Sequence, residues 1–179
     1  MSNPQERSEC RIITDRILAL TIAGAAAAMD LYSMRISNGW ILFSLGAGLW
    51  FCLSGSGPGL PVYLAGAVLP LALLGWLFRF RMLGSGDIKL FCALGGIMGP
   101  EAVLYCIGFS FLTGAAISLA LLISCGGFTE RISYFLEYLA AYLSTGIRKP
   151  YRREGSVPEN FHFTIPIFMS VMLYTGGIY

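Results

Sequence analysis

Long apolar runs, separated by short polar or glycine-rich stretches, dominate the pattern along this chain. Six of them lie at residues 17–36, 40–53, 60–78, 82–100, 102–124 and 161–178. The stretches 54–59 and 99–100 contain the glycine and proline residues typical of turns between such runs. Since a helix needs about 20 apolar residues to cross the hydrocarbon core of a bilayer, the pattern predicts an all-α polytopic membrane protein, built as a six-transmembrane-helix bundle.

One further segment, residues 128–147, is apolar on one face of a helix. It also carries the charged residues Glu130, Arg131 and Glu137. A helix of this kind lies in the membrane interface rather than across the bilayer. We therefore expect an interfacial amphipathic helix before the last span, within a cytoplasmic loop over residues 126–160. If the segment crossed the bilayer instead, the last span would run in the opposite direction.

The composition supports a membrane location for the chain. Of its 179 residues, 56% are hydrophobic and 12% are charged. The mean hydropathy of +0.69 is well above that of an ordinary soluble domain. We expect a single integral-membrane domain over residues 1–179, surrounded by membrane lipids, whose first span is retained because a convincing signal-peptide cleavage site is lacking. The net charge of +2 predicts no nucleic-acid partner.

The cysteines do not follow a metal-binding or disulfide pattern. Five of them stand singly, without a CxxC pair: Cys10, Cys52, Cys92, Cys106 and Cys125. Small buried apolar side chains are the simplest interpretation. The sequence therefore predicts no metal and no cofactor.

The positions of lysine and arginine predict the orientation, because cytoplasmic loops are enriched in them. Six spans sort the loops into two sets on opposite sides of the membrane. The set with the N-terminal segment 1–16 and the turns 54–59 and 99–101 holds three basic residues: Arg7, Arg11 and Arg16. The other set holds nine: Arg35, Arg79, Arg81, Lys89, Arg131, Arg148, Lys149, Arg152 and Arg153. We predict a multi-pass protein of the cytoplasmic, or inner, membrane with an extracytoplasmic N-terminus.

Two aspartates, Asp30 and Asp87, occur within the apolar runs. Two predicted crossings lie between them, and an even number of crossings returns the chain to the same side of the membrane. At a rise of about 1.5 Å per residue, both lie on the order of 10 Å below the cytoplasmic surface of a core about 30 Å thick. The sequence therefore predicts that carboxyl groups 57 positions apart meet near the inner leaflet.

A carboxyl pair at this depth indicates acid–base chemistry. One aspartate at the centre of a membrane helix costs about 2.5–3.5 kcal/mol, so two unsupported ones would be a liability. Facing carboxyls can share a proton, because ionising the second beside the first is unfavourable. An aspartic protease needs this state, in which the carboxylate takes a proton from water and its neutral partner polarises the scissile carbonyl. Asp30 and Asp87 are thus the candidate catalytic pair, with the cytoplasm as the side they face.

The neighbours of the aspartates are candidates for supporting roles. Gly84 and Gly86 lack a Cβ, so we expect unusual backbone dihedrals beside Asp87 and close approach of an extended substrate. Three further residues complete the candidate surroundings of the pair: Arg35, Asn38 and Lys89.

Purely structural interpretations of these residues stay open. Asp30 can be a juxtamembrane acid paired with Arg35, and Asp87 can be the N-cap of the fourth helix after an ordinary loop. Lys89 is more simply a side chain that reaches the interface or balances charge than a catalytic group. His162, the single histidine of the chain, is interpreted as structural or interfacial.

Three stretches resemble motifs of the type IV prepilin peptidases. "GSGDIKLFCALGGIMG" (84–99) is similar to their GxGD segment, in which Gly-x-Gly-Asp-x-Lys-Leu leads into a glycine-punctuated helix. "DLYSMRISNGWIL" (30–42) resembles their first motif, with Ser37 where proline is usual. "FHFTIPIFMSVMLYTGG" (161–177) resembles their closing helix. The two acidic motifs occur in the family's order, and the likeness covers nearly the whole chain from the first span onward.

The resemblance implies an aspartic endopeptidase with a six-helix fold, in which Asp30 and Asp87 are catalytic. Such enzymes remove the short basic leader of pilin-like precursors at the cytoplasmic face, usually after a glycine, so the implied partner is a pilin-like precursor protein. Long family members add an N-terminal cytoplasmic region with paired CxxC motifs, which methylates the new pilin N-terminus. Only about 16 residues precede the first predicted span, which resembles the short, peptidase-only form, and we expect no methyl transfer.

Two other functions compete with this one. Intramembrane aspartic proteases of the presenilin or signal peptide peptidase kind also use a GxGD segment. They place their first aspartate in a Tyr-Asp pair and have more spans, whereas Met29 precedes Asp30 here. A small proton- or cation-coupled transporter, which is not an enzyme, can also place paired carboxylates in a helix bundle. The internal repeats common in transporters are not visible in this sequence.

Overall fold

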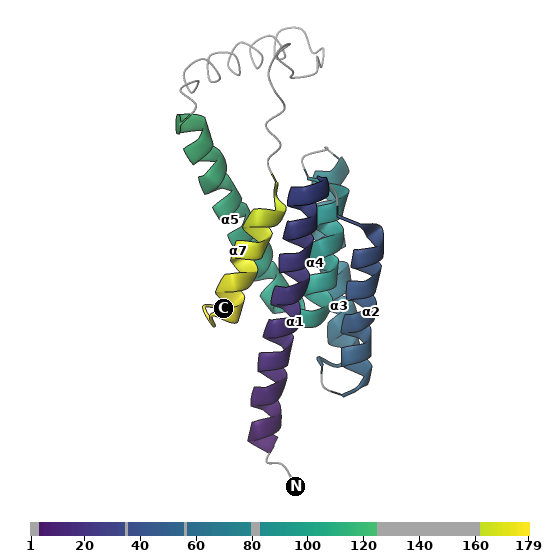
Figure 1. Ribbon diagram of the computed structural model, residues 1–179. Coiled ribbons are helices and arrows are strands. Elements are labelled where there is room, and N and C mark those ends of the chain that lie inside the picture. Colours follow the sequence, from purple (N-terminus) through teal and green to yellow (C-terminus); the bar gives the residue numbers. More distant parts are fainter. Residues whose placement is uncertain (1–3, 35, 56, 80–82, 125–161) are drawn as a thin grey trace. The chain divides into compact units, whose positions relative to one another are not determined.

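The computed structural model describes residues 4–34, 36–55, 57–79, 83–124 and 162–179, and every element in these ranges is a helix. Six helices occur in them (Figure 1): α1 (Pro4–Ser33), α2 (Asn38–Leu53), α3 (Leu60–Arg79), α4 (Ser85–Met98), α5 (Pro100–Ser124) and α7 (Thr164–Thr175). The predicted all-α class is confirmed for these residues. The chain divides into two compact units, Met1–Gly114 with His162–Tyr179, and Ala115–Phe161. All contacts described below lie in the first unit.

Each predicted span coincides with one of these helices, with shifted ends. Helix α1 begins 13 positions before residue 17, and α4 begins at Ser85 instead of residue 82. Three segments are long and apolar enough to cross a membrane: Ile12–Ser33, Leu60–Arg79 and Pro100–Leu121. Helices α2 and α7 are apolar but shorter. The described residues therefore fit a membrane protein with three candidate spans, and the expected amphipathic helix at 128–147 lies outside them.

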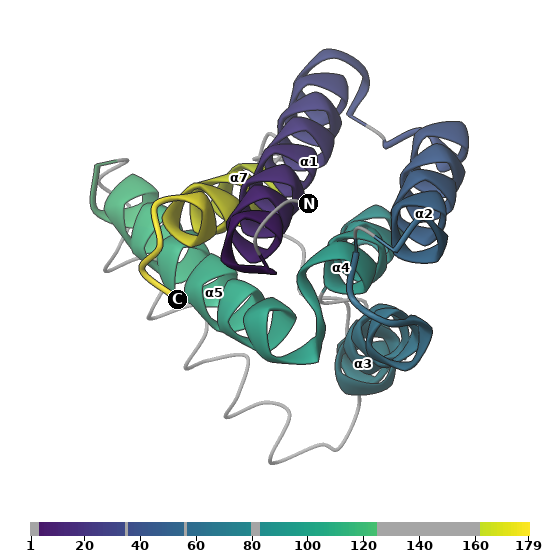
Figure 2. The ribbon, with the colours of Figure 1, turned by 90° about the horizontal axis from the view of Figure 1, so that it is seen from below.

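Helix α4 lies in the middle of the first unit, packed against α1, α2 and α3 (Figure 2). The large side chains of its core face are almost completely buried: Leu90, Phe91, Leu94 and Ile97. Helix α1 contributes small buried residues to the core, Ala19, Ala23 and Ala26, which share one helical face because they are spaced four and three positions apart. Small residues let helix backbones approach each other closely. Accordingly, α1 packs against both α4 and α7.

Helices α3 and α4 touch backbone to backbone at Gly66 and Gly95. An added Cβ at either glycine would overlap the carbonyl oxygen of the other. Such close packing is what associates helices in lipid, where the surroundings are as apolar as leucine and the hydrophobic effect between helices is lost. Tyr63 of α3 extends the contact, because its ring lies against Gly96 and its hydroxyl donates a 2.8 Å hydrogen bond to the carbonyl of Leu45 in α2. These contacts fix α4 against α3 and join α3 to α2.

The turn expected at residues 99–100 is present and has a local cause. Gly99 has a φ of 88°, in the left-handed region that favours glycine. Its N–H donates a 2.8 Å hydrogen bond to the carbonyl of Gly95, which closes α4. Pro100 then begins α5, where proline lacks only an amide that would have no partner within the helix. One glycine and one proline thus end one helix and begin the next.

Candidate active site

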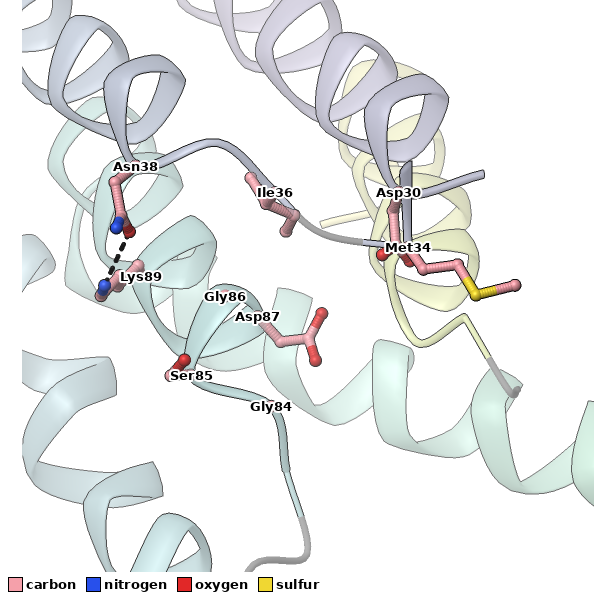
Figure 3. Close-up of a pocket in the computed structure, with 9 residues that line it drawn as sticks. All are labelled: Asp30, Met34, Ile36, Asn38, Gly84, Ser85, Gly86, Asp87 and Lys89. Atoms are coloured by element: carbon pink, nitrogen blue, oxygen red, sulfur yellow. Dashed lines mark hydrogen bonds between the residues drawn. The ribbon is translucent and has the colours of Figure 1, made fainter. Parts of the chain in front are cut away.

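Asp30 of α1 and Asp87 of α4 line one pocket of about 410 Å³ (Figure 3). The full lining is Asp30, Met34, Ile36, Asn38, Gly84, Ser85, Gly86, Asp87 and Lys89. The two carboxyl groups are close enough to interact electrostatically. The structure therefore brings together the two aspartates and four of the five other residues singled out from the sequence. The fifth, Arg35, lies outside the described residues.

Asp30 is held by two side chains from the start of α7. Thr164 Oγ1 donates a 2.7 Å hydrogen bond to Asp30 Oδ2, and His162 Nδ1 lies 2.9 Å from the same oxygen. The side chains of His162 and Asp30 are only 18% and 15% exposed, and Thr164 is fully buried. Hydrogen bonds to a carboxylate relieve the cost of taking its charge out of water. Both side chains that bind the Asp30 carboxylate thus lie more than 130 positions later in the sequence.

The end of α1 lies directly beside Asp30. Met34 follows the helix with a φ of 52°, a left-handed conformation that costs a residue with a Cβ on the order of 1 kcal/mol. Its N–H donates a 2.8 Å hydrogen bond to the carbonyl of Asp30, in the manner of a helix C-cap. The chain leaves α1 here and forms one wall of the pocket.

Asp87 stands in the first turn of α4, three residues after Gly84, which is the N-cap. The Asp87 carboxylate accepts a hydrogen bond from the backbone N–H of Gly84, as the side chain of the third helical residue accepts one from the N-cap in a capping box. The interpretation of Asp87 itself as the N-cap is therefore wrong by three positions. The carboxylate nevertheless has a local structural role, and in Figure 3 it points from α4 into the pocket.

The two glycines beside Asp87 do not have the unusual dihedrals expected from the sequence. Gly84 has φ −69° and ψ 144°, an extended conformation open to any residue, and Gly86 lies within α4. The reason for a glycine at position 84 is instead the lack of room for a side chain, since an added Cβ would stand 2.9 Å from Asp87 Oδ2. At Gly86 the nearest atom to an added Cβ is Ile36 Cδ1 at 3.4 Å, an ordinary contact. Glycine is therefore required more strictly at position 84 than at 86.

Lys89 and Asn38 are joined to each other. Lys89 Nζ donates a 2.9 Å hydrogen bond to Asn38 Oδ1 at an exposed position, which is drawn as the dashed line in Figure 3. Asn38 is the first residue of α2, and Lys89 lies in the first half of α4. The bond ties two helix starts together on one side of the pocket. Lys89 therefore contributes to the pocket wall through its bond to Asn38.

The groups in the pocket suit acid–base chemistry at a carboxyl pair. A carboxyl group accepts or donates a proton according to its protonation state. Within the described parts of the chain, no three His, Cys, Asp or Glu side chains are grouped so as to hold a metal ion. The chemistry that this arrangement itself offers is activation of water by one carboxyl and polarisation of a carbonyl by the other.

The family model of the type IV leader peptidases matches residues 17–119, more than half of the chain. The chain belongs to this family. It is therefore a type IV prepilin peptidase-like protein. Membership of the family supports the conclusion that the protein is a protease. No curated protein matches the chain significantly, and neither does a solved structure.

Both aspartates of this leader peptidase family member lie inside the matched region, while His162 and Thr164 lie beyond it. Sequence reasoning missed these two residues as part of the site. The sequence did contain a signal for His162. The count of membrane crossings that places Asp30 and Asp87 on the same side also places the start of the last predicted span there. It would have placed His162 at the same end as Asp30 and Asp87. Nothing in the pattern marks Thr164, whose role depends on how α7 is rotated.

Proposed function

We propose that this family member is an aspartic endopeptidase that removes the leader peptide of type IV pilin-like precursors. The observation that carries the proposal is the shared pocket of Asp30 and Asp87, on two helices far apart in sequence. Membership of the type IV leader peptidase family supports the class of reaction and the class of substrate. Asp30 and Asp87 are its catalytic residues, and it needs no cofactor.

The pair hydrolyses the peptide bond by general acid–base catalysis. One carboxylate takes a proton from a water molecule, whose oxygen forms a bond to the scissile carbonyl carbon. The other, protonated carboxyl donates its proton toward the carbonyl oxygen as negative charge develops there. In the second step the carboxyl that took the proton from water donates it to the leaving nitrogen as the carbon–nitrogen bond breaks, and the other carboxylate takes back a proton from a hydroxyl of the tetrahedral intermediate as the carbonyl re-forms. The two carboxyls end with one proton between them, as they began.

The proposal also includes the topology: the chain forms a single domain over residues 1–179 and crosses the membrane six times. Helices α2, α4 and α7 have 16, 14 and 12 residues, which makes them about 24, 21 and 18 Å long, against a hydrocarbon core of about 30 Å. Short helices are accommodated by local thinning of the bilayer, or where their ends line a water-filled cavity. Asp87 lies at such an end, which suits a hydrolase.

The pocket faces the cytoplasm in this proposal, and the N-terminal segment 1–16 and the turn 54–59 lie outside. The excess of lysine and arginine in the opposite set of loops supports this orientation. The segment 128–147 is the interfacial helix. A pilin-like precursor has a basic leader joined to a long apolar helix, so its helix can enter the bilayer while its leader remains in the cytoplasm. The scissile junction then lies near the membrane surface, at the depth of the two aspartates.

A co-expression experiment tests the function. The wild type, Asp30→Asn, Asp87→Asn and the double variant are each produced with a type IV pilin precursor, and leader removal is followed as a decrease in its size. Asparagine has the shape of aspartate but neither accepts nor donates a proton at neutral pH, so we expect each single variant to lose processing. A double variant that still removes the leader would exclude the dyad mechanism.

The same experiment separates the competing functions. Sequencing the product N-terminus distinguishes cleavage at the leader junction from cleavage inside the apolar helix, which a presenilin-like protease would make. A transporter would leave the precursor intact in every sample.

A further inference from the structure

We infer that His162 and Thr164 together position the Asp30 carboxylate for catalysis. This inference rests on the proposed function and extends it to two residues beyond the part of the chain that the family match covers. We call the two side chains the Asp30 clamp. They are positioning residues, since they act on the reaction through Asp30.

Both contacts of the clamp go to one oxygen of the carboxylate. Thr164 Oγ1 lies 2.7 Å and His162 Nδ1 lies 2.9 Å from Asp30 Oδ2. The terminal torsion of an aspartate side chain is broad and weakly restrained by itself. Two partners on Oδ2 fix that torsion, and neither of them occupies Oδ1. The clamp thereby presents one oxygen in a defined direction, which is what a base needs in order to take a proton from water.

The start of α7 does not need the Thr164 hydroxyl for its own stability. Threonine at a helix start commonly accepts a hydrogen bond from a free amide of the same helix. Here the N-cap is Phe163, without a side-chain capping bond. Backbone bonds from Ile165 N–H to His162 O (3.2 Å) and from Ile167 N–H to Phe163 O (3.3 Å) close the first turn. The Thr164 hydroxyl instead donates to another helix, 134 positions away in sequence.

Packing holds the clamp itself in place. Thr164 is 1% exposed, and the ring of the adjacent Phe163 packs against Phe111 of α5 with their centroids 5.3 Å apart. A group on a rigid, buried element positions its partner better than one on a free loop. The clamp therefore connects Asp30 on α1, the first helix of the chain, to α7, the last one.

A purely structural role would be to provide hydrogen bonds to a mostly buried carboxylate without fixing its direction. The two roles differ in what their loss changes. If the clamp only satisfies Asp30, its removal lowers the thermal stability of the protein and activity falls only with the folded fraction. If the clamp positions Asp30, the turnover number falls in protein that is folded, while the Michaelis constant for the precursor stays the same.

Isosteric variants at the two positions provide the test, with the purified full-length protein in detergent and a pilin precursor as the probe. Thr164→Val keeps the shape and removes the donor, whereas Thr164→Ser keeps the hydroxyl. His162→Phe keeps a ring without nitrogen, whereas His162→Asn keeps a polar nitrogen near the place of Nδ1. Thr113→Val is the matched control, because among the described residues the Thr113 hydroxyl bonds to two carbonyls of its own helix, those of Phe109 and Ser110.

We expect Thr164→Val and His162→Phe each to lower the turnover number about 10- to 100-fold, with the Michaelis constant within about twofold of the wild type. Thr164→Ser and His162→Asn should recover most of the loss, and Thr113→Val should cleave like the wild type. The inference is overturned if Thr164→Val and His162→Phe cleave at the wild-type rate while Asp30→Asn is inactive. It is equally overturned if their loss of activity only follows a loss of folded protein. A wild type that leaves the precursor uncut, or an active Asp30→Asn, would instead remove the proposed function on which the inference rests.

Discussion

The carboxylate of Asp87 lies so close to Gly84 that a Cβ at position 84 would stand 2.9 Å from Asp87 Oδ2. Real Cβ atoms almost never come this near to another heavy atom, so one of the two groups would have to move. The backbone of Gly84 begins α4 and is extended, while the Asp87 side chain can rotate away. A methyl group at position 84 is therefore accommodated by re-aiming the carboxylate.

With Asp87 in its proposed catalytic role, this relationship predicts that Gly84→Ala lowers the rate of precursor cleavage about 10- to 100-fold, since a displacement of the carboxylate by about 1 Å is enough for such a loss. Stability should change by less than about 1 kcal/mol, because alanine adopts the dihedrals of Gly84 without strain. Cleavage rate and thermal unfolding of the same preparation check the two parts separately.

Two other glycines serve as references for this variant. Gly108→Ala places its methyl group in open space and should leave the cleavage rate unchanged without lowering stability. Gly86→Ala meets Ile36 Cδ1 at 3.4 Å and should cost less activity than Gly84→Ala. Equal losses at positions 84 and 86 would mean that crowding of the Asp87 carboxylate is not the cause.

The helices of this fold could be predicted from the sequence, because long apolar runs mark the helices and glycine–proline turns mark the breaks between them. Their ends could not. Hydropathy detects apolar surface and not backbone conformation, so it missed the polar beginning of α1, which extends to Pro4. It also assigned residues 82–84 to a helix that begins at Ser85.

Counting the predicted membrane crossings was enough to predict which residues lie at the same end of the helices, but not which side chains touch. That count placed Asp30 and Asp87 at one end of the bundle, and they line one pocket. Side-chain contacts depend on the rotation of each helix about its axis, which hydropathy does not give for a helix that is apolar all round. The bond of Thr164 to Asp30 and the bond of Lys89 to Asn38 could therefore be found only from the packed structure.

The hydrogen bond between Lys89 and Asn38 predicts a measurable coupling between these residues. Lys89→Met removes the donor and Asn38→Ala removes the acceptor. In a double-mutant cycle for unfolding we expect a coupling free energy of about 0.5–1 kcal/mol, since the bond is exposed and screened by solvent. Lys89→Gln retains an N–H donor and should keep part of the coupling. Strictly additive effects of the two substitutions would show that the bond contributes nothing to stability.

The orientation can be checked with a short biotin-acceptor sequence, which is modified only in the cytoplasm. Inserted into the turn 54–59, it should stay unmodified because the proposed topology places this turn outside. Inserted directly after Arg79, it should be modified. Each tagged protein must still process the precursor, so that only correctly folded chains are counted. Modification at 54–59 with none after Arg79 would reverse the topology and place the aspartates near the outer surface.

The backbone contact of Gly66 with Gly95 predicts that a side chain at position 66 destabilises the fold. Gly66→Ala drives a methyl group into the carbonyl group of Gly95, and no side-chain rotation can relieve this overlap, because the obstacle is backbone. Helices α3 and α4 must separate, so we expect a loss of about 1–3 kcal/mol or more, measured as thermal unfolding in detergent. Gly75→Ala, on the same helix with no described neighbour within 4 Å, is the control and should unfold at or above the wild-type temperature, because alanine is the better helix former. Because α4 carries Asp87, the Gly66→Ala variant should also lose cleavage activity in proportion to the separation of the helices, whereas an unchanged unfolding temperature would contradict the close packing of α3 on α4.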